Sequence, residues 1–122
     1  MFYEAFLARD VDAIVALYAD DAVNHQVPEE PLHGKAEIRR GFERFFAAFP
    51  DERTNAVAFY EDGEWGMWEW RGGPPGKPGA VHGSGFFHVR EGKIVLQRGY
   101  WDRLTFLRVH DREPDDPPSM LS

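Results

Sequence analysis

Residues 80–102 read Ala80-Val-His-Gly-Ser-Gly-Phe-Phe-His-Val-Arg-Glu-Gly-Lys-Ile-Val-Leu-Gln-Arg-Gly-Tyr-Trp-Asp102. β-branched and aromatic residues dominate both halves of this stretch, and Glu91-Gly92 between them is a typical turn dipeptide. The stretch therefore predicts a hairpin of two strands, 80–90 and 93–103. Upstream, residues 53–60 and 64–71 predict a second pair of strands joined at Asp62-Gly63, and the loop 72–79 connects the two pairs.

The first part of the chain is predicted to be mainly helical. Apolar residues at helical spacing indicate one helix through Phe2, Phe6 and Leu7 and a second through residues 11–18, after a break at Arg9-Asp10. A short strand covers residues 22–27, and a third helix runs from Gly34 until Pro50 stops it. Helices followed by a strand meander predict an α+β fold, in which a curved antiparallel sheet wraps over the helices.

Composition limits the possible roles of the protein. The 122 residues suffice for a single domain, placed at residues 1–110, and the proline- and acid-rich segment 111–122 is predicted to be unstructured. The net charge of -7 argues against nucleic acid or an anionic membrane as the partner. No apolar run approaches a membrane span and no leader-like segment is recognised, so a cytoplasmic protein is expected.

Metal sites and disulfides are not expected either. The chain has no cysteine, which excludes disulfides and thiolate ligands. Its histidines lack the tight spacing with acids that metal sites require. We therefore expect chemistry without a metal or a cofactor.

Asp102 combines position and chemistry better than any other residue. It ends a predicted strand beside Tyr100 and Trp101, which suggests the rim of a hydrophobic concavity. A carboxylate there is expected to have a raised pKa and to transfer protons. The alternative is a surface ion pair with Arg98 or Arg103.

The register of the last hairpin decides which side chains accompany Asp102. A three-residue connection with a left-handed Gly92 would pair Val89 with Lys93 and His82 with Tyr100. One face would then carry a mixture of polar and aromatic groups, as a binding pocket does. Its members would be His82, Ser84, Phe86, His88, Arg98, Tyr100 and Asp102. A two-residue turn would shift the register by one and exchange the faces.

Several segments together resemble a known family. They are Leu17-Tyr-Ala-Asp-Asp-Ala-Val-Asn-His25, His33-Gly-Lys-Ala-Glu-Ile-Arg39, Phe46-Ala-Ala-Phe-Pro-Asp51, and Glu91-Gly-Lys-Ile94 with the ending Tyr-Trp-Asp102. They resemble the SnoaL-like branch of the nuclear transport factor 2-like superfamily, over the chain up to about Arg108. The resemblance implies a cone-shaped fold with an internal cavity. Its members include polyketide cyclases, limonene-epoxide-hydrolase-like enzymes, ketosteroid isomerases and non-catalytic binding modules.

Each branch implies different residues. Where the isomerases have their catalytic groups, this chain has Phe2, Gln26 and Ser84, so steroid isomerisation is not expected. The epoxide-hydrolase pattern would use Asp102 and Glu69 as acids and Asn24 and Gln26 to hold water, but its arginine falls at Met67. The cyclase pattern uses Asp102 as the acid/base, with His82 or His88 in support.

We therefore predict a cofactor-free, cyclase- or isomerase-like acid/base enzyme acting on a small apolar molecule that bears oxygen. The alternatives are epoxide hydrolysis by Asp102 and Glu69, and a non-catalytic ligand-binding or dimerisation domain. Predicted catalytic residues are Asp102, Glu69 and His82, and predicted substrate-binding residues are Asn24, Gln26, Trp68, Ser84, His88, Arg98 and Tyr100. A small hydrophobic ligand and a second copy of the chain, docked on the outer sheet face, are the expected partners.

Overall fold

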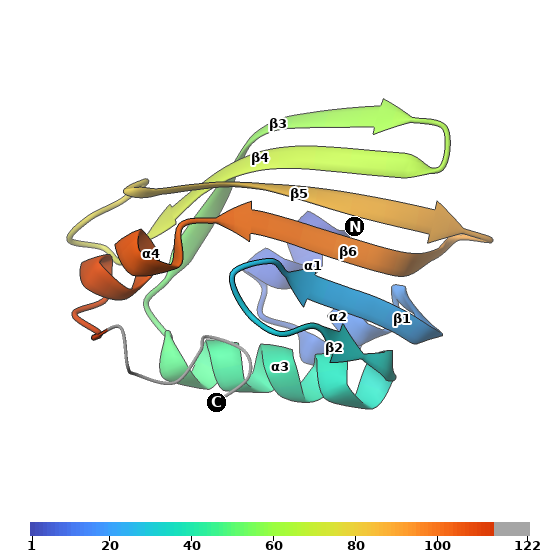
Figure 1. Cartoon of the computed structure of the whole chain (residues 1–122), viewed down its shortest axis with the longest axis horizontal. Helices are drawn as coiled ribbons and strands as arrows, with labels where there is room; N and C mark the ends of the chain where they lie inside the picture. Colours follow the sequence, from blue (N-terminus) through green and yellow to red (C-terminus); the bar gives the residue numbers. More distant parts are fainter. Residues whose placement is uncertain (114–122) are drawn as a thin grey trace.

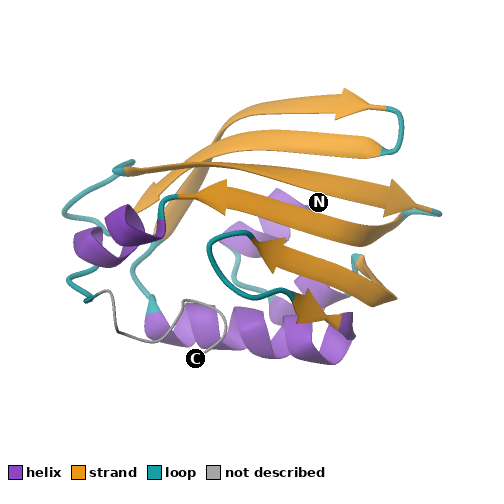
Figure 2. Ribbon diagram, viewed as in Figure 1, coloured by secondary structure: helices purple, strands orange, loops and turns teal. Residues whose placement is uncertain are grey.

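The computed structural model describes residues 1–113 and shows one curved sheet with three helices against its concave side (Figures 1 and 2). In chain order the elements are α1 (Phe2–Leu7), α2 (Val11–Val15), β1 (Tyr18–Gln26), β2 (Leu32–His33), α3 (Gly34–Ala48), β3 (Arg53–Asp62), β4 (Trp65–Gly73), β5 (Val81–Arg90), β6 (Lys93–Trp101) and α4 (Arg103–Val109). The predicted α+β class and the wrapping of the sheet over the helices are confirmed.

The six strands lie in the order β2-β1-β6-β5-β4-β3. Strands β3 to β6 form the predicted antiparallel meander, whereas β1 pairs in parallel with β6 and places the last strand in the middle of the sheet. Tyr18, predicted to continue the second helix, starts β1 instead and pairs with Ile94. The apolar spacing of a short helix cannot be told from the start of a buried strand, so the long-range pairing decides.

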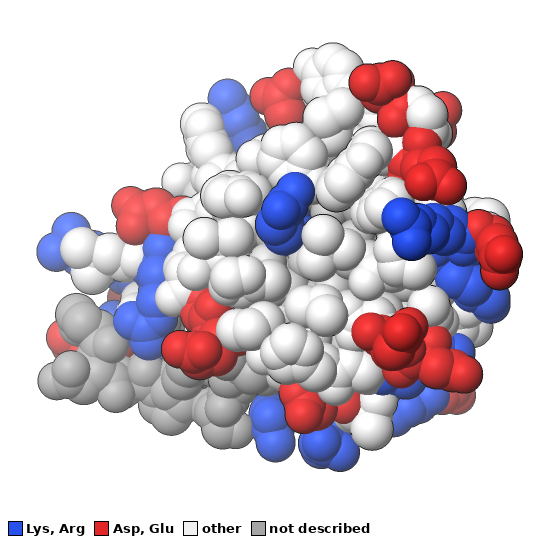
Figure 3. Space-filling model, turned by 45° about the vertical axis from the view of Figure 1, so that its right-hand side comes forward, with Lys and Arg blue, Asp and Glu red and all other residues white. Residues whose placement is uncertain are grey.

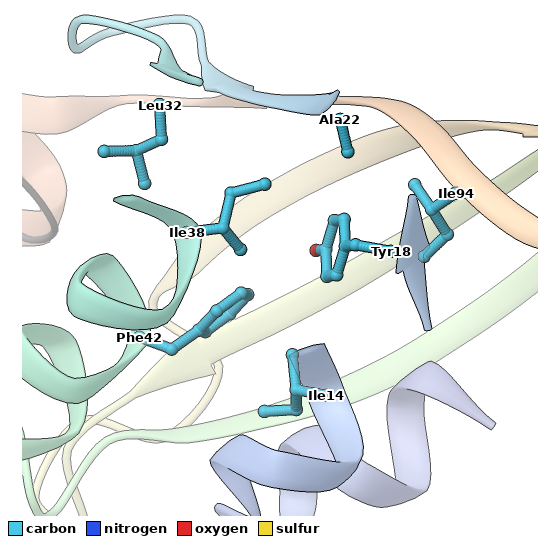
Figure 4. Close-up of a cluster of buried hydrophobic side chains, with 7 residues drawn as sticks. All are labelled: Ile14, Tyr18, Ala22, Leu32, Ile38, Phe42 and Ile94. Atoms are coloured by element: carbon cyan, nitrogen blue, oxygen red, sulfur yellow. The ribbon is translucent and has the colours of Figure 1, made fainter. Parts of the chain in front are cut away.

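The main core lies between α2, α3, β1 and β6 (Figure 4). It contains Ile14, Tyr18, Ala22, Leu32, Ile38, Phe42 and Ile94. A smaller cluster of Phe49, Val81 and Phe106 joins the end of α3 to β5 and α4. The two clusters attach the helices to opposite ends of the concave sheet face.

The turn of the last hairpin differs from the prediction. Arg90 pairs with Lys93, so Glu91-Gly92 is a two-residue turn, and both residues have positive φ, 51° and 76°. Such turns match the twist of paired strands. The register then shifts by one residue between His88 and Val89, which brings Ser84 opposite Tyr100. The predicted pair of His82 with Tyr100 is therefore wrong.

The chain after β6 forms a helix that was not predicted. Strand β6 ends at Trp101 rather than continuing to residue 103, and α4 begins at Arg103. Beyond α4, the Arg112 guanidinium donates to the main-chain oxygen of Ala48 at 2.8 Å and lies 4.7 Å from the Phe49 ring centre. The chain thus contacts the domain past the predicted boundary at residue 110. Most of the segment predicted to be unstructured, residues 114–122, lies outside the described residues.

None of the helices described in this structure is long and apolar enough to cross a membrane.

Candidate functional site

A pocket lies between the concave sheet face and helices α1, α3 and α4; we call it the inner pocket. Its volume is about 80 Å³. It is lined by Phe2, Phe6, Gln26, Phe42, Phe45, Glu52, Thr54, Trp68, Trp70, Gln97, Trp101 and Phe106. With about 10–15 Å³ needed for each water-sized group, the volume admits a molecule of about five to eight heavy atoms. Aromatic rings supply most of the wall, so the pocket suits a compact and largely apolar molecule.

Side-chain amides of β1 and β6 form one polar patch, the amide cluster, which consists of Asn24, Gln26 and Gln97. Gln26 Nε2 donates to Asn24 Oδ1 at 2.8 Å, and Gln26 Oε1 accepts from the Trp101 indole N–H at 2.9 Å. The Tyr18 hydroxyl donates to Gln97 Oε1. Burial raises the pKa of Tyr18, so this hydroxyl stays protonated.

The amide cluster has donor capacity to spare. Asn24 is 1% exposed, and its Nδ2 is buried without a hydrogen-bond partner among the described residues. Asn24 itself does not line the inner pocket; the two amides of the cluster that do are Gln26 and Gln97. Gly99 makes the arrangement possible, because a Cβ at that position would lie 2.0 Å from Gln26 Oε1.

A buried acid and a histidine form a second polar group. Glu52 follows α3 and lines the inner pocket, and His110 caps the end of α4. Glu52 Oε2 lies 2.9 Å from His110 Nε2, and their side chains are 2% and 7% exposed. The imidazole is packed against Phe49 and Phe106, with ring centres 4.8 and 4.6 Å away.

Gly72 leaves space for the carboxylate of Glu52. A Cβ at position 72 would lie 2.4 Å from Glu52 Oε1. The main-chain oxygen of Glu52 accepts hydrogen bonds from Arg9 at 2.7 Å and from Arg53 at 3.0 Å. The residue is therefore held at its backbone by two guanidinium groups and at its side chain by His110.

Three predicted binding residues lie at the inner pocket. Gln26 and Trp68 line it. Asn24 does not line it but accepts a hydrogen bond from Gln26. The alternation of side chains along β1 left open which set faces the helices. In the structure this set includes Asn24 and Gln26.

Six other predicted site residues lie on the opposite side of the sheet, which we call the outer face. They are Glu69, His82, Ser84, His88, Arg98 and Tyr100. Successive side chains of a strand point to opposite sides. Because Trp68, Trp70, Gln97 and Trp101 face the pocket, their neighbours face away. The expectation that these six line the pocket is therefore wrong.

Interactions on the outer face occupy several of these groups. Glu69 accepts a hydrogen bond from the Tyr60 hydroxyl at 2.8 Å, an exposed contact that raises the pKa of Tyr60. His88 stacks on Trp65 with ring centres 4.5 Å apart and contacts Glu64 at 3.1 Å. Ser84 and Arg98 do share a face with Tyr100, as predicted, but it is the face without the pocket.

Asp102 also lies outside the inner pocket. It is exposed and caps the N-terminus of α4. The hydrogen bond from the Thr105 hydroxyl lowers the pKa of Asp102 most, and bonds from main-chain N–H groups add to this. The expected raised pKa is therefore wrong, because the carboxylate is solvated and bonded rather than desolvated.

Sequence reasoning missed Glu52, Gln97 and His110. Glu52 directly follows the quoted Phe49-Pro-Asp51, but an acid after a proline turn has no distinguishing signal. His110 could not be placed without α4, and Gln97 sits in a strand whose inner face was assigned to the other set of residues. A correct prediction of α4 would have brought His110 into consideration.

A family model described as the SnoaL-like domain matches residues 1–97. This chain belongs to the SnoaL-like family. A comparison with curated protein sequences finds no match for it.

Solved structures share the fold of this SnoaL-like protein. A protein with a ketosteroid isomerase-like fold from Catenulispora acidiphila, in complex with trimethylamine, has a TM-score of 0.80 at 19% identity, over 96% of this chain and 94% of its own. A candidate polyketide cyclase from Sinorhizobium meliloti has a TM-score of 0.68 at 22% identity, over 80% and 88%. A candidate isomerase of the SnoaL-like family from Agrobacterium tumefaciens has a TM-score of 0.70 at 19% identity, over 83% and 94%. At these identities the comparisons establish the fold alone.

Proposed function

We propose that this SnoaL-like protein binds a small, largely apolar molecule in the inner pocket and holds an oxygen atom of that molecule with the amide cluster. The observation that carries the proposal is the placement of Gln26 and Gln97 beside one another on a pocket wall that is mostly aromatic. Amide groups at a dry surface discriminate strongly between ligands that fill their hydrogen bonds and ligands that do not.

The names of similar structures support this class of ligand. One of them is described as a candidate polyketide cyclase, and a polyketide is a carbon skeleton that bears oxygen. The arrangement of acids does not favour the epoxide-hydrolase alternative, because Asp102 and Glu69 both lie outside the inner pocket.

Cyclopentanone tests the proposal, because it has six heavy atoms and one oxygen. Three tryptophans that line the pocket make intrinsic fluorescence a direct reporter. We expect cyclopentanone to change this fluorescence and to shift the side-chain amide NMR signals of Gln26 and Gln97. Cyclopentane, which lacks the oxygen, is expected to bind more weakly. Equal binding of both rings would show that the amides do not recognise oxygen.

The variant Gly99→Ala makes the same test from the protein side. The added methyl group must displace the Gln26 amide, and loss of one hydrogen bond predicts about two- to tenfold weaker binding of cyclopentanone. The matched control is Gly66→Ala, where a Cβ would meet no atom within 4 Å. Equal weakening by both substitutions would contradict a role for the amide cluster.

We also propose that the outer face pairs with a second copy of the chain. Phe86 and Tyr100 form an edge-to-face pair with ring centres 5.8 Å apart, and the Arg98 guanidinium lies 5.6 Å from the Trp65 ring centre. Arg98 Nε is buried without a hydrogen-bond partner among the described residues. Figure 3 shows mostly uncharged side chains across the middle of the molecule, with Lys or Arg atoms among them and more charged groups around this area. A partner of matching composition would cover this area.

A further inference from the structure

We propose that Glu52 transfers protons to and from the ligand in the inner pocket, and that His110 exchanges those protons with solvent. The inference rests on the proposed function, because it requires a molecule in the pocket. It assigns the chemistry to a pair of residues at the junction of α3, β3 and α4, on the wall that does not carry the amide cluster.

Glu52 links the inside of the protein with its surface. Its side chain lines the inner pocket, and its Oε2 atom contacts His110 Nε2 at 2.9 Å. His110 in turn lines a separate surface groove that includes Pro50, Lys77 and Asp111. A proton accepted by Glu52 therefore has a one-step route through an imidazole to the outside. An imidazole suits this task because one ring nitrogen can accept a proton while the other releases one.

A purely structural role would be the simplest alternative, since the pair also fastens α4 to the start of β3. Burial of a carboxylate is costly, however, and apolar residues of similar size often serve a fold equally well. Here the Glu52 carboxylate lies at the pocket wall, and the absence of a side chain at Gly72 leaves room for it. Arg9 and Arg53 donate to the main-chain oxygen of Glu52, which leaves His110 as the described hydrogen-bond partner of its carboxylate.

The proposed chemical step acts on a ketone bound in the inner pocket. The Glu52 carboxylate removes a proton from the carbon next to the carbonyl group, so that a C–H bond breaks and an O–H bond forms on Glu52. The electron pair of the C–H bond moves to the carbonyl oxygen, and the amide cluster stabilises the resulting enolate by hydrogen bonds. Return of a proton from Glu52 to the carbon restores the ketone. In D₂O the acid proton exchanges through His110 before its return, and the product is deuterated ketone and HOD.

Deuterium uptake by cyclopentanone in D₂O, followed by proton NMR, tests this step. We expect the wild-type protein to accelerate uptake over buffer, and Glu52→Gln to lose about a hundredfold or more of that acceleration, the usual size of acid/base catalysis. The amide of Gln can keep a hydrogen bond to His110. Glu52→Asp is the second variant if Glu52→Gln does not fold; it keeps the charge, withdraws it by one methylene, and should show reduced uptake.

His110→Ala tests the relay. We expect slower uptake in this variant and recovery when free imidazole is added, because the vacated space adjoins the surface groove. A merely structural histidine would not give imidazole rescue. The matched control is His82→Ala, an exposed histidine on the outer face, which should behave as wild type.

Cyclopentanone binding is measured by tryptophan fluorescence in each variant, so that the outcomes separate. If the ketone binds but the wild-type protein does not accelerate uptake, or if Glu52→Gln accelerates it equally, the role of Glu52 is overturned and the proposed function stands. If His110→Ala is unimpaired or is not rescued by imidazole, the relay is overturned. If cyclopentanone does not bind at all, the proposed function and this inference both fail.

Discussion

The carboxylate of Asp102 accepts a hydrogen bond from the Thr105 hydroxyl, with 2.7 Å between Oδ2 and Oγ1. It also accepts one from the main-chain N–H of Leu104 at 3.1 Å. These bonds satisfy donors at the start of α4, so the chain leaves β6 as a helix. That helix brings Phe106 to the inner pocket and His110 to Glu52. Asp102 therefore affects the candidate site by fixing where α4 begins.

Substitution of this cap should destabilise the protein in a pH-dependent way. The folded-state pKa of Asp102 is lowered, so its contribution is present at neutral pH and is lost as the pH falls below about 4. We expect Asp102→Ala to unfold more easily than wild type in urea at pH 7, and the difference to shrink near pH 3. Asp21→Ala, also an exposed carboxylate, is the control. An equal difference at both pH values would contradict the cap.

The buried hydroxyl of Tyr18 should matter more than an exposed one. Tyr18→Phe removes the donor to Gln97 Oε1 in a region with no solvent access and is expected to cost about 1–3 kcal/mol of unfolding free energy. Tyr60→Phe removes a hydroxyl bonded to Glu69 at the surface, and its effect should be much smaller. Thermal and urea denaturation of both variants make the comparison. Equal effects would mean that the Tyr18 bond contributes little.

Gly72 should tolerate no side chain. The methyl group of Gly72→Ala would collide with Glu52 Oε1, and overpacking of this kind costs about 1–3 kcal/mol. Gly66→Ala in the same strand meets open space and should be nearly neutral. Urea denaturation measures both variants, and NMR of the His110 ring should show a disturbed environment in Gly72→Ala only. A neutral Gly72→Ala would show that Glu52 can move freely.

The outer face should control self-association. Phe86→Asp places a charge in the centre of the proposed contact and is expected to convert a dimer into a monomer, as judged by light scattering after gel filtration. The control is Phe59→Asp on β3, because Phe59 is 61% exposed and stacks on Trp68 of the inner side. A monomeric wild-type protein would contradict the pairing.

Local sequence patterns were sufficient to predict most of the helices and strands. The apolar spacing of Ile38 and Phe42 and the stop at Pro50 predicted α3 closely, and strand composition with Gly-containing turns predicted β3 to β6. These signals depend on neighbours a few residues away, and the structure preserves them. The start of β1 and the existence of α4 were not predicted, because each depends on pairing or packing with distant parts of the chain.

The candidate site was predicted only in part. Gln26 and Trp68 reach the inner pocket as expected, while Asp102 and its supposed partners do not. Both faces of the central strands carry aromatic and polar residues, so composition did not distinguish the inner face from the outer one. The bulge near Val89 altered the hairpin register in a way that no short motif encodes.

Periodicity and turn chemistry act over a few residues, so local sequence patterns predicted α1 to α3, the meander of β3 to β6 and the α+β class. The resemblance to the SnoaL-like family rested on its motifs. Long-range packing settles which sheet face meets the helices and which polar groups become buried there. The contact of Glu52 with His110 joins residues 58 positions apart and exists because α3 and α4 end side by side. Chemistry that depends on such a contact is set by packing, which local sequence patterns do not record.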